Sequence, residues 1–356
     1  MRPLPPFVRA RRLQQRTLLR AVAAAWLGVA LEIACAAEAP PAELKLSVAV
    51  GHALPLGKAA ERWSQRLAEA GDAKVAAKVH AGAVLAARDP VREVAALKEG
   101  AADLAVGSAL QWSLQLPALG VFTLPWIAPD HDALAALAAN EPLRAALSQR
   151  LERQGIVLVA IAPLAHRELA TTSRSIRAPA DLAGLRVRAS PMPMVHDTLL
   201  ALGALPQAMG FAQAQAAFAS GALDAQEGTP SALASARTGA SGQRNLTLWG
   251  AIGDAMIFAV RKSLWDGFTD AQRDAMRRTA RQAIVDTDAR AREEAAIRAL
   301  SQNGMTVVRI TPAGHEAFRT AVGDVLARWR GAIGDDIVKL ADEALAQRQA
   351  TPRAGS

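Results

Sequence analysis

Short apolar segments alternate with helical patterns after the N-terminal stretch, and this order restricts the fold more than any other feature of the chain. Leu44, Leu46 and Val48 alternate with polar or small residues, which predicts a strand over residues 44–50. Further strands are predicted over 75–79 and 102–106, and helices that end at a glycine over 57–70 and 88–99. The order strand, helix, strand, helix, strand indicates an α/β layer with parallel pairing.

A second α/β run follows a continuous apolar strand that is predicted over residues 156–161. Its predicted strands are 168–171, 185–189, 222–226, 246–249 and 256–260, and its predicted helices are 193–202 and 211–220. No internal repeat joins the two runs, so the chain is expected to form two α/β lobes.

One long helix is predicted to join these lobes. Thr269 and Gln272 form a capping box that opens it, and Asn303-Gly304 ends it after Gln302. At 1.5 Å per residue, such a helix is roughly 50 Å long, more than one small domain spans. A strand over 305–310 and helices after Pro312 complete the prediction.

The N-terminal stretch has the order of an export signal. Six arginines precede the apolar residues 27–31, and Ala34-Cys35-Ala36 offers small residues for cleavage. We therefore predict a signal peptide over 1–36, a linker over 37–43 and a periplasmic location. Arg11-Arg12 leaves a twin-arginine signal open, Cys35 leaves a lipidation site open, and an uncleaved anchor is a further alternative.

The charge of the chain is concentrated in this stretch. Its six arginines against Glu32 leave only +3 of the formal +8 for the remaining residues, which contain no run of Lys or Arg. Tyrosine is absent and aromatic residues make up 4%, which argues against a nucleic-acid partner with stacking platforms. Cys35 is the only cysteine, so disulfides and thiolate chemistry are not expected beyond it.

No motif for catalysis, a cofactor or a metal is found in the sequence. Gly107-Ser108 lacks the second glycine of a nucleophile elbow, and there is no Walker loop or dinucleotide fingerprint. The six histidines are scattered without metal-ligand spacing. The chain is therefore predicted to be neither an enzyme nor a cofactor or metal carrier.

Several motifs occur in a characteristic order. Arg167 is followed by Asp181-Leu182-Ala183-Gly184-Leu185-Arg186-Val187-Arg188, then Leu202-Gly203-Ala204-Leu205-Pro206, then Gly221-Ala222-Leu223-Asp224-Ala225-Gln226-Glu227. Leu97-Lys98-Glu99-Gly100 before Asp103, Phe122-Thr123-Leu124-Pro125-Trp126, and Leu264-Trp265 ahead of Asp270 complete the set. Over roughly residues 44–310 this ordered set resembles the DctP-type solute-binding proteins of TRAP (tripartite ATP-independent periplasmic) transporters.

The resemblance implies an α/β, two-lobed periplasmic-binding-protein-like fold, with hinge-linked lobes that close on one small organic acid. The expected lobe I comprises 44–163 and 253–293, and lobe II comprises 164–252 and 294–350. The expected partner is a TRAP membrane permease, and we expect a monomer. A binding protein of another transporter or of a sensor system, and a periplasmic enzyme, are the alternatives.

Two arginines are the main candidates for the ligand site. The resemblance implies that Arg188 clamps a carboxylate, for which a planar guanidinium is well suited, and that Arg167 is a second arginine. The alternation over 185–188 places Arg186 and Arg188 on one face of a strand. The alternatives are a surface position on an edge strand for Arg188 and an interlobe salt bridge for Arg167.

Five further residues are candidate ligand contacts. The resemblance makes Glu227 a candidate to bind a cation beside the ligand, as a few relatives of this type do, with a structural hydrogen bond as the alternative. Gly228 and Gln215 stand where the family commonly has a polar residue and an aromatic residue, which leaves the identity of the ligand open. Trp126 follows a proline and is a candidate for the cleft wall, with core packing as the alternative. His52 follows the first strand and is a candidate for the same wall, with a solvated loop position as the alternative.

Overall fold

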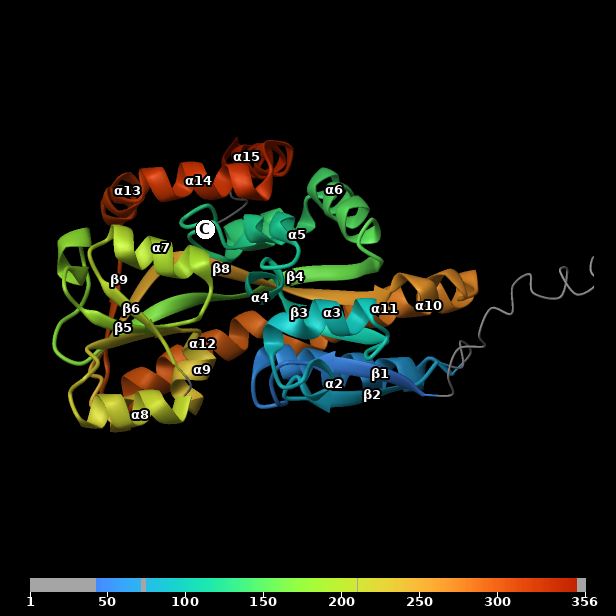
Figure 1. Ribbon diagram of the computed structural model, residues 1–356, viewed down its shortest axis with the longest axis horizontal. Coiled ribbons are helices and arrows are strands. Elements are labelled where there is room, and N and C mark those ends of the chain that lie inside the picture. Colours follow the sequence, from blue (N-terminus) through green and yellow to red (C-terminus); the bar gives the residue numbers. More distant parts are fainter. Residues whose placement is uncertain (1–42, 72–74, 210, 351–356) are drawn as a thin grey trace, which may run out of the picture. The chain divides into compact units, whose positions relative to one another are not determined.

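Two long antiparallel strands, β4 (Ile156–Thr171) and β8 (Asn245–Arg261), run side by side along the sheet (Figure 1). The computed structural model describes residues 43–71, 75–209 and 211–350. In these ranges nine strands form one sheet in the order β2-β1-β3-β8-β4-β7-β5-β6, with β9 paired to β8. The other strands are β1 (Leu44–Val48), β2 (Ala77–Ala81), β3 (Leu104–Ser108), β5 (Arg186–Ala189), β6 (Leu205–Ala208), β7 (Ala225–Gly228) and β9 (Thr306–Arg309).

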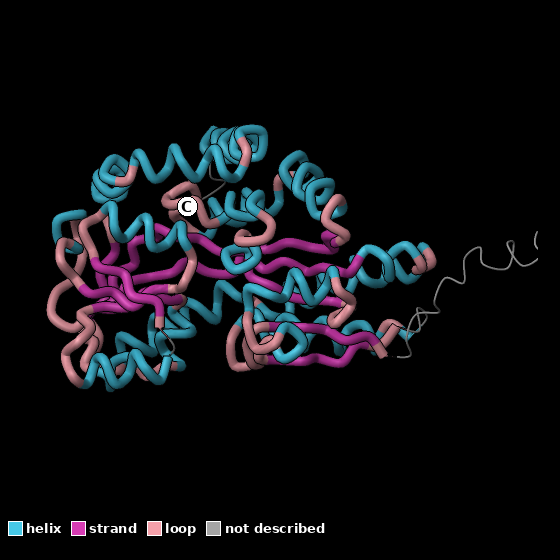
Figure 2. Tube along the Cα trace, in the orientation of Figure 1, coloured by secondary structure: helices cyan, strands magenta, loops and turns pink. Residues whose placement is uncertain are grey.

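The two long strands belong to two groups of shorter strands. At one end β8 pairs with β3, which continues into parallel β1 and β2. At the other end β4 pairs with β7, which continues into parallel β5 and β6, and β8 pairs with β9. Both groups alternate with helices, as Figure 2 shows, so the predicted α/β class is confirmed.

The helices pack on both faces of the sheet. They are α2 (Pro55–Glu69), α3 (Glu93–Lys98), α4 (Ala109–Trp112), α5 (His131–Ala139), α6 (Glu141–Glu152), α7 (Pro193–Ala201), α8 (Phe211–Ala219), α9 (Pro230–Ser235), α10 (Lys262–Asp266), α11 (Asp270–Thr287), α12 (Ala289–Gln302), α13 (Pro312–Ala321), α14 (Gly323–Ile333) and α15 (Asp335–Ala350). Trp63 of α2 and Ala280 of α11 share one core with β1, whereas Leu134 of α5 and Ile337 of α15 share another. A third core, around Trp249 and Phe318, lies beside β5 and α7.

Two predictions about element length were wrong. The strands predicted separately over 156–161 and 168–171 are both part of β4, and those over 246–249 and 256–260 are both part of β8. The helix predicted over 270–302 is two helices, because Asp288 adopts a left-handed conformation with φ 43°. The Asp288 side chain accepts a hydrogen bond from Ala291 N at 3.1 Å and starts α12.

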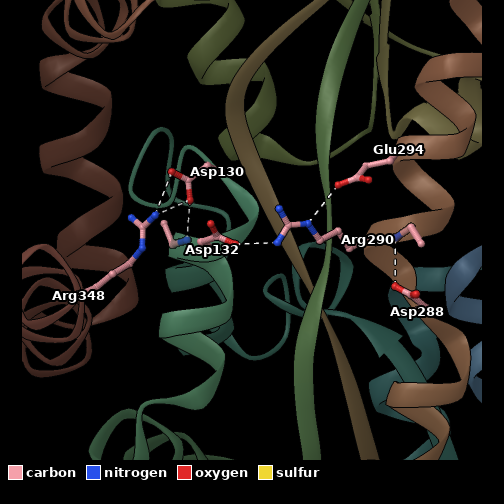
Figure 3. A network of polar contacts seen from close by, with 8 residues as sticks. Asp130, Asp132, Asp288, Arg290, Glu294 and Arg348 are labelled. Atoms are coloured by element: carbon pink, nitrogen blue, oxygen red, sulfur yellow. Dashed lines mark hydrogen bonds and ion pairs between the residues drawn. The ribbon is translucent and has the colours of Figure 1, made fainter. Parts of the chain in front are cut away.

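Two ion pairs connect the start of α5 with α15 and with α12, close to the break between α11 and α12 at Asp288 (Figure 3). Arg348 of α15 donates to Asp130 at 3.1 Å, and Arg290 of α12 donates to Asp132 at 2.8 Å. Asp130 also caps α5 by accepting from Ala133 N at 2.7 Å. Arg290, Asp132 and Asp130 are about half exposed and Arg348 is 28% exposed, so each ion pair is expected to contribute at most about 1 kcal/mol to stability.

The predicted signal peptide and nearly all of the linker lie outside the described residues. Among the helices that are described, none combines the length and the apolar character needed to cross a membrane. The division into lobes stays a prediction.

Glu93 is a buried carboxyl that is expected to make stability depend on pH. Its side chain accepts hydrogen bonds from Ser47 Oγ at 2.9 Å and Trp112 Nε1 at 3.4 Å, and burial raises its pKa from 4.5 to about 7. The stability that the protonated form contributes is present below pH 4.5 and is lost as the pH rises through about 7. Between about pH 5 and about pH 8, wild type should therefore lose about 1–3 kcal/mol more unfolding free energy than Glu93→Gln. Urea denaturation at both pH values measures this, and equal losses in the two proteins would contradict it.

Candidate functional site

The candidate site begins on β5, whose residues alternate in burial. Val187 and Ala189 are buried, whereas Arg186 and Arg188 on the other face are partly exposed. Arg186 binds Asp224 through two hydrogen bonds of 2.8 Å and is 39% exposed. The alternation predicted from the sequence is confirmed, and Arg186 is held by its own acid on the surface.

Among the described residues, no acid forms an ion pair with Arg188. Within the described residues its one hydrogen bond runs from Nε to the carbonyl oxygen of Met209 at 3.3 Å. Partial burial lowers its pKa, the charge of Arg167 lowers it further, and Glu227 opposes both. The guanidinium is therefore partly desolvated, with its terminal nitrogens available to bind an anion.

Arg167 lies on β4 and forms a bidentate ion pair with Glu227 of β7. Nε of Arg167 donates to Oε2 of Glu227 and Nη2 donates to Oε1, the latter at 2.9 Å. Ser190 N also donates to Oε1, so the carboxylate, only 1% exposed, accepts three hydrogen bonds. Burial alone would raise the pKa of Glu227, but Arg167 holds it below the usual value. The pair is close to neutral as a unit.

Asp254 of β8 is a further acid near this pair that the sequence analysis missed. Its carboxylate accepts from Ser108 Oγ at 2.5 Å and from Leu110 N at 3.0 Å, which connects β8 to the end of β3 and the start of α4. Burial raises its pKa, and its charge acts on Arg167. The sequence did contain a signal for Asp254, because it is an acid inside the apolar run of residues 251–260. A carboxylate buried in such a run needs hydrogen-bond or charged partners, which marks it as a candidate site residue.

Gly228 and Gln215 contact other parts of the second strand group. A Cβ atom on Gly228 would lie 3.3 Å from Cδ2 of Leu233, so the space beside this glycine is already filled on that side. Gln215 of α8 accepts a hydrogen bond from Ser241 Oγ and lines a surface hollow with Phe218 and Arg237. Within the described residues no hydrogen bond joins Gln215 to the arginines.

Trp126 and His52 lie in contrasting environments. Trp126 is 2% exposed, stacks on Phe318 with ring centroids 5.4 Å apart, and donates its indole N–H to Trp249 O at 3.0 Å. Little of its ring is accessible to a ligand in this conformation. His52 is exposed in the turn after β1. Neither is joined to Arg188 by a hydrogen bond among the described residues.

A separate cavity of about 390 Å³ contains other titratable groups, among them His131, His166, Glu168 and His315. Neither Arg167 nor Arg188 lines it. His166 and Glu168 flank Arg167 on β4 and point to the other face of the strand. Burial raises the pKa of Glu168 to about 7 and lowers that of His166. In the described ranges no group of His, Cys, Asp and Glu has a geometry for a metal ion.

Comparison with known proteins decides the family. Residues 46–331 match the model of the bacterial extracellular solute-binding protein family 7, DctP. The chain belongs to this family. It is 28% identical over 329 residues to the C4-dicarboxylate-binding periplasmic protein DctP of Rhodobacter capsulatus, covering 90% of this chain and 96% of that protein.

Solved structures of TRAP solute-binding proteins agree with the family and the fold. A protein from Ralstonia eutropha H16 with bound (S)-2-hydroxy-2-methyl-3-oxobutanoate is 37% identical and has a TM-score of 0.79. The alignment covers 86% of this chain and 99% of that protein. A protein from Sulfurospirillum deleyianum with bound succinate is 22% identical and has a TM-score of 0.72. The alignment covers 85% of this chain and 98% of that protein. The two-lobed α/β fold and the TRAP solute-binding class, both predicted from the ordered motifs, are confirmed.

Proposed function

We propose that this solute-binding protein captures a small organic acid in an interlobe cleft, with Arg188 as the clamp for its carboxylate. The observation that carries the proposal is the partly buried guanidinium of Arg188, whose one hydrogen bond within the described residues goes to a carbonyl oxygen. A carboxylate that leaves water needs such charged donors, and a planar fork can bind both of its oxygens.

The remaining predicted residues have supporting places in this proposal. Arg167 lies near enough to Arg188 to lower its pKa, and Glu227, which binds Arg167, balances that charge. Gln215, Gly228, Glu227, His52 and Trp126 stay predicted ligand contacts. The relative from Ralstonia eutropha supports an organic acid, because a carboxylate is bound in its structure.

The proposal extends to how the protein works in the cell. The signal peptide over 1–36 would direct the chain to the periplasm, and the closed monomer would deliver its ligand to a TRAP permease without chemical change. Closure would follow from the ligand binding the closed state more tightly than the open state. The lobes would be those predicted from the sequence, joined by β4 and β8.

Mass spectrometry of small molecules released from gently purified protein tests this function. We expect a carboxylic acid at up to about one molecule per chain, recovered unmodified after long incubation with the protein. Release of a neutral or cationic molecule would contradict the proposed carboxylate clamp. Conversion of the acid to a product would instead indicate a periplasmic enzyme.

A further inference from the structure

We propose that the site selects acids with a single negative charge, and that Glu227 sets this selectivity by neutralising Arg167. The inference rests on the proposed function, since it assumes that the ligand lies against Arg188. It adds the charge of the ligand, which the family alone does not fix, because relatives bind both a 3-oxo monocarboxylate and succinate.

Among the described residues, few charged groups lie close to Arg188. Arg188 of β5 pairs with Gln226 of β7, the residue before Glu227, and Ser190 N donates to the Glu227 carboxylate. Glu227 is joined to Arg167 through both carboxylate oxygens, so these are the charged groups beside Arg188. Arg167 also feels the charge of Asp254, a second acid on the neighbouring strand. The two arginines carry two positive charges. Glu227 cancels one of them, and Asp254 reduces the remainder to the extent that it is ionised. At most one positive charge is left for a ligand.

The described residues near Arg188 offer few polar donors to a second carboxylate. At position 228 this chain has a glycine without a side-chain donor, and Leu233 fills the space beside it. Arg88 and Arg92, in the segment between β2 and α3, are exposed, so water and salt screen their charges. A second carboxylate would therefore lose water without gaining a counter-charge near Arg188.

A matched pair of ligands tests this without any mutation. Succinate and succinamate have nearly the same size, but succinamate carries an amide in place of one carboxylate. We expect wild type to bind succinamate at least about tenfold more tightly than succinate in isothermal titration near neutral pH, because one unpaired charge is removed. Equal affinity, or tighter binding of succinate, would overturn the inference.

Glu227→Gln tests the assigned residue. The amide keeps the shape of the side chain and can still accept a hydrogen bond from Arg167, but it releases the arginine's charge. We expect the preference for succinamate to fall by about tenfold, mostly through tighter binding of succinate. An unchanged preference in a variant with the circular dichroism spectrum of wild type would remove Glu227 from this role.

The outcomes separate this inference from the proposed function. If succinate binds more tightly than succinamate and binding depends on Arg188, the carboxylate clamp stands and the charge selectivity fails. If neither of these acids nor 2-hydroxy-2-methyl-3-oxobutanoate binds, both proposals fail.

Discussion

Replacing Arg188 by alanine is expected to weaken binding of a carboxylate ligand such as succinamate by about tenfold to a few hundredfold. Each hydrogen bond to a charged group contributes about 1.5–3 kcal/mol net, and the ligand's charge would be left without its donor. Because the guanidinium makes only one hydrogen bond within the described residues, at 3.3 Å, its loss should change the unfolding free energy little. Isothermal titration and urea denaturation of the same preparation measure the two effects.

Arg186 provides a matched control on the same strand face. Its charge is already paired with Asp224, and it is 39% exposed. Arg186→Ala should therefore leave the dissociation constant within about threefold of wild type. If Arg188→Ala binds as tightly as wild type, or if both variants lose affinity equally, Arg188 is not the clamp.

Local patterns predicted the arginines on β5 well, because alternation depends on neighbouring residues alone. Val187 and Ala189 are buried and the two arginines share the other face, as the period of two requires. The partners of these arginines could not be predicted in the same way. Glu227 lies 60 residues from Arg167, and only the pairing of β4 with β7 brings them together. For Glu227 the prediction was a cation contact, with a structural hydrogen bond as the alternative. For Arg167 it was a ligand contact, with an interlobe salt bridge as the alternative. The structure shows the two residues in an ion pair with each other.

The length of β4 was underestimated because of Pro163 and the polar residues that follow it. A proline normally argues against a central strand, since it cannot donate to the neighbouring strand. Here the register of β4 with β8 shifts between Pro163 and Ala165, which accommodates the missing donor. The polar side chains of Arg167 and Glu168 find buried partners in Glu227 and the backbone of Trp249, so the strand continues past them.

The break in the long helix was also hidden by local propensity. Residues 270–302 contain no glycine or proline, so a continuous helix was the simplest prediction. Asp288 nevertheless adopts a left-handed conformation, which aspartate tolerates better than most residues, and it then caps α12. Aspartate is a favoured N-cap residue, so Asp288 was a possible sign of a new helix start. The sequence alone does not distinguish such an aspartate from one in the middle of a continuous helix.

Trp126→Ala is expected to lower the unfolding free energy by about 3–5 kcal/mol, the usual cost of removing a large buried aromatic side chain. The ring stacks on Phe318 of α13 at 5.4 Å and meets Trp249 of β8 edge to face at 5.5 Å. Its loss would leave a cavity in the core beneath α13. Urea denaturation measures the effect, and a loss below about 1 kcal/mol would contradict the core role.

Trp126→Phe separates this core role from the predicted contact with the ligand. Phenylalanine keeps most of the buried ring but cannot donate to Trp249 O, which the indole reaches at 3.0 Å. That variant should lose about 1–3 kcal/mol of stability, because a buried carbonyl oxygen loses a donor and the smaller ring packs less well. Because Trp126 is 2% exposed, we expect the affinity of the folded variant for succinamate to stay within about threefold of wild type. A tenfold or larger loss of affinity at unchanged fold would place the ring in the ligand site, which would require a rearrangement that brings it out of the core on closure.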